Sequence, residues 1–430
     1  MNKIKIRMDP KSKSSRRVSL ASFVGTAIEW YDFYLYGTAA ALIFNILFFP
    51  NLSPTIGIIA AFSTYSVGFF ARPFGGIIFG HFGDKISRKK MLILTITLMG
   101  LSTFLIGLLP TYHQVGLWAP VLLVVLRILQ GLAVGGEWGG AIVIAAEHSR
   151  EKERGFYSSW PNAGAPFGLV LSIAMFLTFA SLPDKQFIAW GWRIPFLLGI
   201  ILVGVGLFIR LRILESPIFR ELKTKAKLPV LDIVKYSKKK FLLAMGSRFA
   251  ESASFYMFTV FVLTYVTTNL QLPKSTILYA VMAASFIETF SIPLFGSLSD
   301  RIGRRPVYLF GAILVGLFAF PFFWLLQTKN TALIWLAVVF PLTLGHAAMH
   351  GPQAAFISEL FKTKVRYSGA AIAYHLSAAF SGGLAPLIAT GLIAWTGRTW
   401  AVSLYLILMS CITVVSVFLA QETSQKDISQ

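Results

Sequence analysis

The sequence predicts an all-α polytopic membrane protein with twelve transmembrane helices in two six-helix pseudo-repeats. Three observations support this fold class. The chain of 430 residues is 56% hydrophobic and only 13% charged, whereas soluble domains carry about 25% charged residues. Apolar stretches long enough to cross a bilayer as helices recur from end to end. A charged loop motif also occurs twice, roughly half a chain apart.

The apolar stretches define the expected elements in order. Helices of this length, joined by short polar loops, fill the chain and leave no room for a large soluble domain. The first stretch carries Glu29 and Asp32 in its interior, which is not the pattern of a cleavable signal peptide. The expected spans are 20–44, 56–80, 91–110, 119–147, 158–180, 192–209, 241–268, 275–297, 306–326, 331–358, 368–395 and 400–419.

The longest polar run is rich in lysine and separates the two halves of the chain. Pro217 near its start discourages continuation of the sixth helix. We therefore expect a first bundle and a second bundle of six helices, with a cytoplasmic segment before, between and after them. The corresponding ranges are 1–19, 20–209, 210–240, 241–420 and 421–430.

The net charge of +21 is distributed in a pattern typical of membrane proteins. Lysine and arginine cluster in alternate loops, and this positive-inside pattern places both termini in the cytoplasm. The basic surplus is therefore interpreted as an orientation signal, and no nucleic acid is expected as a partner. Cys411 is the single cysteine, which excludes an intramolecular disulfide and a cysteine-based metal site.

The charged motif occupies equivalent positions in the two halves. The first copy runs from Gly80 to Lys90 and the second from Gly296 to Pro306. Each is followed at a similar distance by a Glu-x6-Arg pattern. Two parallel repeats, related by an axis along the membrane normal, follow from this spacing.

These motifs resemble the major facilitator superfamily. Its hallmark is a Gly-x-x-x-Asp-x-x-Gly-Arg-Arg loop between helices two and three, echoed between helices eight and nine. The second copy here is complete, whereas the first has Ser87 for glycine and Lys89 for arginine. A narrower match is similar to the metabolite:proton symporter branch, which includes shikimate, 2-oxoglutarate, citrate and proline/betaine transporters. Its matching segments are 29–33, 127–140 and 190–196.

The resemblance implies that the repeated charges form a cytoplasmic gate, which locks the inward side shut in the outward-facing state. The alternative is that these charges only orient the protein in the membrane. The candidate gate residues are Asp84, Arg88, Glu147, Arg154, Asp300, Arg304, Glu359 and Arg366.

Charges inside the predicted helices are candidates for proton coupling, since charge within a membrane is costly and is kept where it has a function. Glu29 and Asp32 are three residues apart and share a helix face. By resemblance, Arg127, with Gln130 one turn later, lines the cavity and is tied to proton coupling. Its guanidinium could pair with Asp32, permanently or in competition with substrate, or it could bind a substrate carboxylate.

Other polar side chains in the helices are candidates for substrate binding. In the seventh helix, Arg248 and Glu251 could form an intrahelical ion pair, or Arg248 could be a second cation in the cavity. His346 and His350 have zinc-like spacing but no third ligand in sequence, so no metal site is expected. The candidate substrate-binding residues are Arg127, Gln130, Tyr31, Arg248, Glu251, His346 and His375.

Together these features predict a proton-coupled importer of a small organic acid, such as a shikimate-like compound or another mono- or dicarboxylate. It would work by alternating access in a bacterial inner membrane, as a monomer, with no cofactor beyond the proton gradient. An enzyme is not expected, because the charged sets suit gates better than a catalytic site. The alternatives are a proline/betaine importer, against which the short tail after the last helix weighs, and a non-transporting solute sensor.

Overall fold

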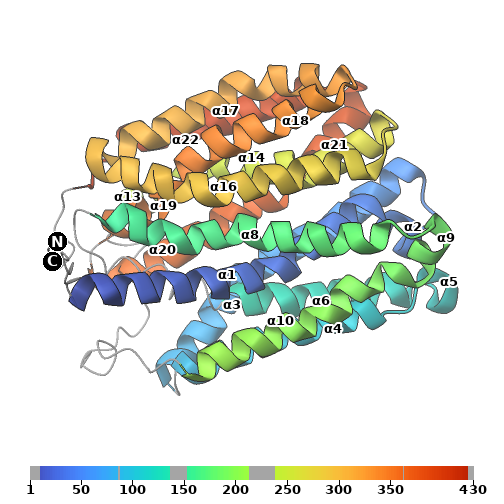
Figure 1. The fold of residues 1–430 in the computed structure, drawn as a ribbon, viewed down its shortest axis with the longest axis horizontal. Coiled ribbons are helices and arrows are strands. Elements are labelled where there is room, and N and C mark those ends of the chain that lie inside the picture. The colour runs from blue at the N-terminus through green and yellow to red at the C-terminus, as the bar shows by residue number, and fades with distance from the viewer. Residues whose placement is uncertain (1–9, 86–87, 136–152, 213–237, 362, 425–430) are drawn as a thin grey trace, which may run out of the picture.

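The computed structural model describes residues 10–85, 88–135, 153–212, 238–361 and 363–424 of the chain. Counting each interrupted helix once, its helices form twelve long rods that run side by side (Figure 1). Within these described residues, nine rods are long and apolar enough to cross a membrane, and a bent pair within 184–207 makes a tenth. The first rod begins and the last rod ends at the same end of the bundle, termed here the terminal end; the opposite end is the far end.

The first six rods make up the N-terminal half. Short helices connect them at the far end: α2 (Phe44–Phe48), α5 (Tyr112–Val115), α9 (Asp184–Gln186) and the π-helical η2 (Phe187–Gly191). The rods themselves are α1 (Pro10–Leu42), α3 (Pro54–Lys85), α4 (Arg88–Leu108), α6 (Trp118–Gly135), α8 (Arg154–Ala180) and α10 (Arg193–Arg212).

The other six rods make up the C-terminal half, and three of them contain π-helical turns. The continuous rods are α16 (Lys274–Ile302), α17 (Arg304–Gln327) and α22 (Trp400–Leu419). The interrupted rods are α13 (Lys238–Ser247), α14 (Phe249–Tyr256), η3 (Met257–Phe261), α15 (Val262–Thr264) and η4 (Tyr265–Asn269); α18 (Thr331–Phe340), η5 (Pro341–His346) and α19 (Ala347–Leu360); and α20 (Thr363–Ala378), η6 (Ala379–Gly383) and α21 (Ala385–Thr396). Such π-helical turns are frequent at functional sites.

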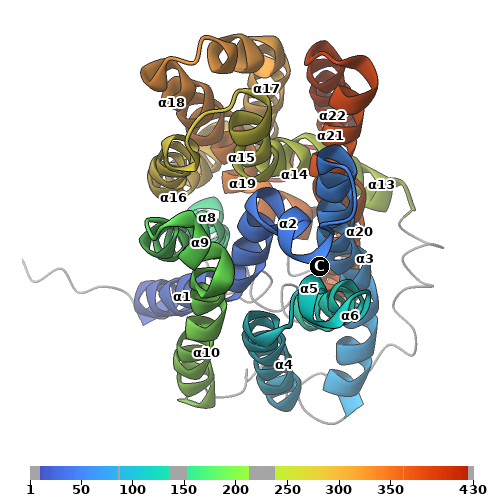
Figure 2. The ribbon, with the colours of Figure 1, turned by 90° about the vertical axis from the view of Figure 1, so that its right-hand side faces the viewer.

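The two halves lie against each other, as Figure 2 shows from the far end. Helix α8 packs on α16, and α3 packs on α20 and α21. Where α8 meets α16, a Cβ on Gly155 would lie 2.5 Å from the carbonyl oxygen of Gly296, and one on Gly296 would lie 2.7 Å from that of Gly155. Glycine at both positions therefore permits the close approach of the two backbones.

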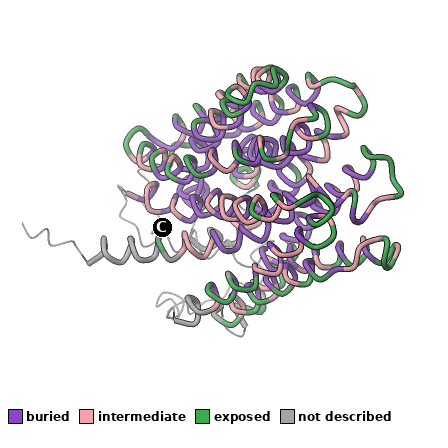
Figure 3. Tube along the Cα trace, turned by 45° about the vertical axis from the view of Figure 1, so that its right-hand side comes forward, coloured by how far each residue is buried: buried purple, intermediate pink, exposed green. Residues whose placement is uncertain are grey.

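The distribution of buried and exposed residues is that of a membrane protein. Buried residues fill the interior of the bundle, and exposed residues lie on its outside (Figure 3). Large apolar side chains such as Leu294, Leu317 and Trp395 are exposed on the outer surface, whereas charged side chains such as Asp32, Arg72 and Arg127 are buried. A lipid environment accounts for both features.

Candidate functional site

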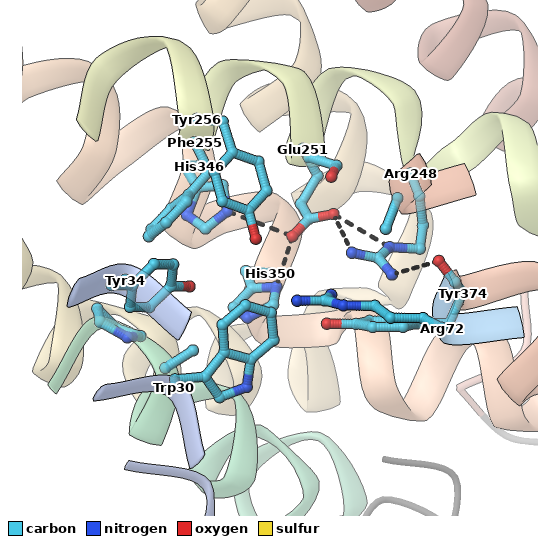
Figure 4. Close-up of a pocket in the computed structure, with 14 residues that line it drawn as sticks. Trp30, Tyr34, Arg72, Arg248, Glu251, Phe255, Tyr256, His346, His350 and Tyr374 are labelled. Carbon is cyan, nitrogen blue, oxygen red and sulfur yellow. Dashed lines mark hydrogen bonds and ion pairs between the residues drawn. The ribbon is translucent and has the colours of Figure 1, made fainter. Parts of the chain in front are cut away.

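A small buried pocket lies between the two halves (Figure 4). Its walls come from α1, α3 and α8 of one half and from α14, η5, α19, α20 and the junction before α14 of the other. The cavity offers about 20 Å³ to the centre of a water molecule, which is room for about one water. The described lining residues are Trp30, Tyr34, Arg72, Ala165, Pro166, Arg248, Glu251, Ser252, Phe255, Tyr256, His346, His350, Tyr374 and Ala378.

Arg248 forms a two-pronged ion pair on the C-terminal wall of the pocket. Its Nε and Nη2 atoms donate to the same oxygen of Glu251 at 3.1 and 2.9 Å, and its Nη1 donates to the carbonyl oxygen of Tyr374 at 3.1 Å. The guanidinium also lies 3.3 Å from the centre of the Tyr374 ring. Arg248 therefore pairs with Glu251 one turn later and also lines the pocket, and its role in substrate binding stays a prediction.

Two histidines and a second carboxylate extend this network. The other oxygen of Glu251 lies 3.0 Å from Nδ1 of His350 and 3.3 Å from Nε2 of His346. The Nδ1 atom of His346 hydrogen-bonds Glu288 of α16, which is fully buried. Each carboxylate on this wall therefore faces a basic group, an arrangement that offsets the cost of burying the charges.

The same side chains could offer ligands to a divalent ion. One ligand atom from each of Glu251, His346 and His350 lies within 4.8 Å of the others, and these are ligand types that zinc accepts. The guanidinium of Arg248 on the same carboxylate opposes a second cation at this place. The sequence expectation of no metal site stays a prediction.

Arg72 of α3 is buried on the N-terminal wall and lies among aromatic rings. Its guanidinium carbon lies 4.0 Å from the centre of the Phe33 ring, 4.4 Å from Phe69 and 5.0 Å from Trp30. In Figure 4 its guanidinium points toward the middle of the labelled side chains. Arg72 is not among the candidate residues predicted from the sequence. The available signal was a lone charge inside the apolar helix.

Arg127 and Asp32 form no ion pair with each other in the structure. Arg127 donates to Gln130 at 2.5 Å, and Gln130 donates to Thr103 at 2.8 Å. Thr103 and the Asp32 carboxylate both lie against Gly199 of α10. The side chains of Gln130 and Thr103 therefore lie between the two charges, and neither Arg127 nor Asp32 lines the described pocket.

The remaining sequence candidates lie near the pocket but not on its walls. Tyr31 donates its hydroxyl to the carbonyl oxygen of Pro195 at 2.9 Å and so points into the N-terminal half. His375 is buried beside the Tyr374 ring, and Glu29 is buried on α1. The structure thus brings together Arg248, Glu251 and His346 from the predicted substrate set.

At the terminal end, the carboxylate of Asp300 on α16 joins the two halves. It accepts hydrogen bonds from the backbone N–H groups of Gly155 at 2.8 Å and Phe156 at 2.9 Å, at the start of α8. A carboxylate is favoured at a helix N-terminus, where unpaired N–H groups and the helix dipole point toward it. Arg304 holds the same carboxylate from its own half at 2.7 Å.

A second ion pair crosses between the halves beside Asp300. Arg154 of α8 lies 3.1 Å from Glu359 of α19, and Arg304 lies 3.5 Å from the same oxygen. Arg154, Asp300, Arg304 and Glu359, termed here the terminal-end cluster, therefore join the halves, and their role as a cytoplasmic gate stays a prediction. Glu147 lies outside the described residues, as do the side chains of Asp84, Arg88 and Arg366 and most of the predicted linker.

The segment after α22 also contacts this cluster. Thr423 donates its hydroxyl to Glu359 at 2.6 Å, and Glu422 accepts the backbone N–H groups of Arg304 and Arg305 at 2.9 and 3.0 Å. Partial burial raises the pKa of Glu422, but hydrogen bonds from four backbone N–H groups outweigh burial and hold the pKa below its usual value. Glu422 therefore caps the start of α17, directly after Gly303, whose φ of 101° ends the helix α16.

At the far end, a larger cavity of about 610 Å³ lies between the halves. Its walls come from the ends of α8 and η4 and from the start of α16. Across this cavity, Nζ of Lys274 lies 3.2 Å from Oδ1 of Asp184 in the other half, and the Asp184 side chain is largely exposed. The halves are therefore hollowed at the far end and joined by buried charges at the terminal end.

Two helical halves around a buried, charged pocket are the architecture of a multi-pass membrane transporter with a central site. The sequence pattern of the Major Facilitator Superfamily matches residues 22–386 and 244–429. The chain belongs to this superfamily and is a transporter, not an enzyme. The twelve-helix fold class and the family resemblance predicted from sequence are confirmed.

The relatives are bacterial transporters. The chain is 40% identical to the shikimate transporter of Escherichia coli (strain K12), over 96% of this chain and 95% of that one. It is 32% identical to the proline/betaine transporter of the same organism, over 96% of this chain and 85% of that one. A solved structure of the proton:xylose symporter XylE superposes with a TM-score of 0.75 at 18% identity, covering 96% of this chain and 97% of XylE, which shows the shared fold.

Proposed function

We propose that the chain is a proton-coupled symporter that imports a small organic acid across a bacterial inner membrane. The observation that carries the proposal is the pocket between the halves, whose described walls hold two buried arginines. Buried guanidinium groups suit a solute that carries a carboxylate. The identity to a shikimate transporter supports the same substrate class.

The distribution of basic loops supports cytoplasmic termini, which makes the terminal end cytoplasmic and the far end external. In the proposed cycle, solute and proton arrive through the far-end cavity while the terminal-end cluster keeps the cytoplasmic side closed. Asp32 takes the proton, because both of its oxygens are buried and receive no hydrogen bond from the described residues. The terminal-end cluster then opens and both ligands leave inward.

The pocket must widen during this cycle. Its present volume admits a water molecule rather than a metabolite, so the walls between the two halves must move apart to admit the solute. Loss of the Arg154–Glu359 pair and of the Asp300 cap would separate α8 from α16 and open the site at the terminal end.

A proline/betaine importer is the second candidate, and one observation favours it. The stacked rings of Trp30 and Tyr34 lie 5.0 Å apart in the pocket, and aromatic rings bind quaternary ammonium groups. Arg72, however, already lies over the Trp30 ring with its own positive charge. That cation opposes an ammonium group and favours an acid.

The proposal is tested by reconstituting the protein in liposomes with an inward proton gradient. Labelled organic acids, proline and betaine are offered separately. Gradient-dependent accumulation of an acid is the expected result. Accumulation of betaine or proline instead would overturn the substrate class, and uptake of none of these solutes would contradict the proposed transport function.

A further inference from the structure

Arg72 is a buried cation whose donors are unused. Its side chain is fully buried, and Nε, Nη1 and Nη2 all lack a hydrogen-bond acceptor within the described part of the chain. Its near contacts are the rings of Phe33, Phe69 and Trp30. Cation–π contacts offset part of the cost of burying a guanidinium, but they leave its five N–H donors without partners. A missing anionic partner is the simplest account of this arrangement.

The other two arginines of the core are already engaged. All three nitrogens of the Arg248 guanidinium donate, two of them to Glu251 and one to the carbonyl oxygen of Tyr374. Arg127 donates to Gln130 and to the carbonyl oxygen of Tyr65, and it does not line the described pocket. Arg72 alone among these three both faces the pocket and has every donor available.

The permanent charges on the described pocket walls sum to a net charge of +1. Arg72 and Arg248 are two permanent cations, and Glu251 is the one carboxylate among the lining residues. His346 has a carboxylate partner of its own behind the wall, Glu288. A solute with a single negative charge would therefore balance the pocket, whereas a dianion would leave a buried negative charge uncompensated.

We propose that Arg72 binds the carboxylate of the transported solute and that this solute is a monocarboxylate. The inference rests on the proposed function and deepens it, because it names the recognition residue and narrows the substrate class. The planar fork of the guanidinium matches a carboxylate bidentately. The stacked Trp30 and Tyr34 rings beside it, with the hydroxyl groups of Tyr256 and Tyr374 on the same lining, suit a solute with a compact ring and hydroxyl groups.

The test uses Arg72→Gln and Arg72→Lys in proteoliposomes, with Arg398→Gln as the matched control on an exposed far-end turn. The probes are shikimate with one carboxylate, 2-oxoglutarate with two, and betaine. We expect the unaltered protein to accumulate shikimate. The KM for shikimate should rise about 10- to 100-fold in Arg72→Gln, because the charge-assisted hydrogen bonds to the carboxylate are lost. Arg72→Lys should recover part of the affinity, because it keeps the charge without the fork. Arg398→Gln should match the unaltered protein.

The outcomes separate this inference from the proposed function. A KM for shikimate within about twofold of the unaltered value in Arg72→Gln would overturn the role of Arg72 and leave organic-acid import standing. Transport of 2-oxoglutarate as efficiently as shikimate would overturn the monocarboxylate assignment alone. Accumulation of betaine only, or of none of the probes, would overturn the proposed function and this inference with it. If Arg72→Gln does not purify as a monodisperse protein, an unchanged KM in Arg72→Lys contradicts the inference on its own.

Discussion

The charged groups of the two halves are organised differently around one pocket. In the C-terminal half, Arg248, Glu251, His346 and Glu288 form a chain in which every charged group has an opposite partner. In the N-terminal half, Arg72 has no acceptor and Asp32 has no donor among the described residues. The charges of the C-terminal wall are therefore balanced within that wall, whereas on the N-terminal side the proposed solute and proton would supply the missing partners.

The two halves also differ in how often π-helical turns interrupt their helices. Four π-helical turns interrupt rods of the C-terminal half, η3, η4, η5 and η6, and η5 ends at His346 in the pocket wall. In the N-terminal half, the one π-helical turn among the described residues is η2, which lies before α10 at the far end and does not line the pocket. Within the described residues, the half with balanced charges therefore has the more frequently interrupted helices.

The largest expected effect comes from Asp32→Asn, which removes the proposed proton acceptor. Accumulation of solute against its gradient should be lost, because an amide cannot take up and release a proton, while solute exchange without a gradient continues. Uptake and counterflow in liposomes measure the two activities. Asp32→Glu, which keeps a titratable carboxylate at the same position, is the matched control and should retain part of the accumulation. Undiminished accumulation by Asp32→Asn would remove this residue from the coupling step.

The next effect concerns the balanced C-terminal network. Glu251→Gln leaves Arg248 buried without its counter-ion, and breaking such a pair costs about 3–5 kcal/mol. Unfolding in detergent should show this loss of stability, and a double Arg248→Met, Glu251→Met variant should recover most of it, since both charges are then absent. A loss below about 1 kcal/mol in the single variant would mean that the network is not the balanced unit described here.

A smaller effect is expected where the halves meet at the terminal end. Asp300→Asn weakens the cap on α8. A cap that stabilises the closed terminal end by about 1 kcal/mol lowers the population of the open state roughly fivefold, so its loss should raise that population by the same factor. Ser159 lies at the contact of α8 with Gly296. A cysteine there, with Cys411→Ser, should react faster with a maleimide when Asp300 is replaced. An unchanged labelling rate would show that this carboxylate does not hold the halves together.

The smallest effect is expected for Glu422→Gln. The pKa of Glu422 is held below its usual value of 4.5 in the folded protein, so its carboxylate stabilises the fold above that pH. This stabilisation is lost as the pH falls through the lowered pKa. The variant should thus unfold at a lower temperature than the unaltered protein at neutral pH, and the difference should narrow toward acid. A difference that stayed constant with pH would exclude the charge as its cause.

The fold could be predicted from the sequence because bilayer thickness fixes helix length and lipid contact fixes composition. The terminal-end contacts followed from the repeated motif, since Asp300, Arg304 and Glu359 recur at equivalent positions in both halves. Such regularities are local or periodic and need no knowledge of how helices rotate against each other.

The pocket could not be predicted to the same degree. Whether Arg127 reaches Asp32 or turns to Gln130 depends on side-chain rotamers and helix rotation, which the sequence does not encode in any short pattern. Tyr31 points away from the pocket for the same reason, although Tyr34, one turn later, lines it. Arg72 is a lone charge in an apolar helix, but the sequence does not show whether another helix supplies its partner. Only the structure shows that its donors have no acceptor among the described residues.

The central claim is that the proton is taken up in the N-terminal half and not by the balanced C-terminal network. The most direct test places a pH-sensitive dye inside liposomes and follows internal pH when shikimate is added outside. We predict acidification for the unaltered protein and for Glu288→Gln, and none for Asp32→Asn, at equal amounts of reconstituted protein. Acidification that persists in Asp32→Asn and is lost in Glu288→Gln would place the coupled proton in the C-terminal half and contradict this account.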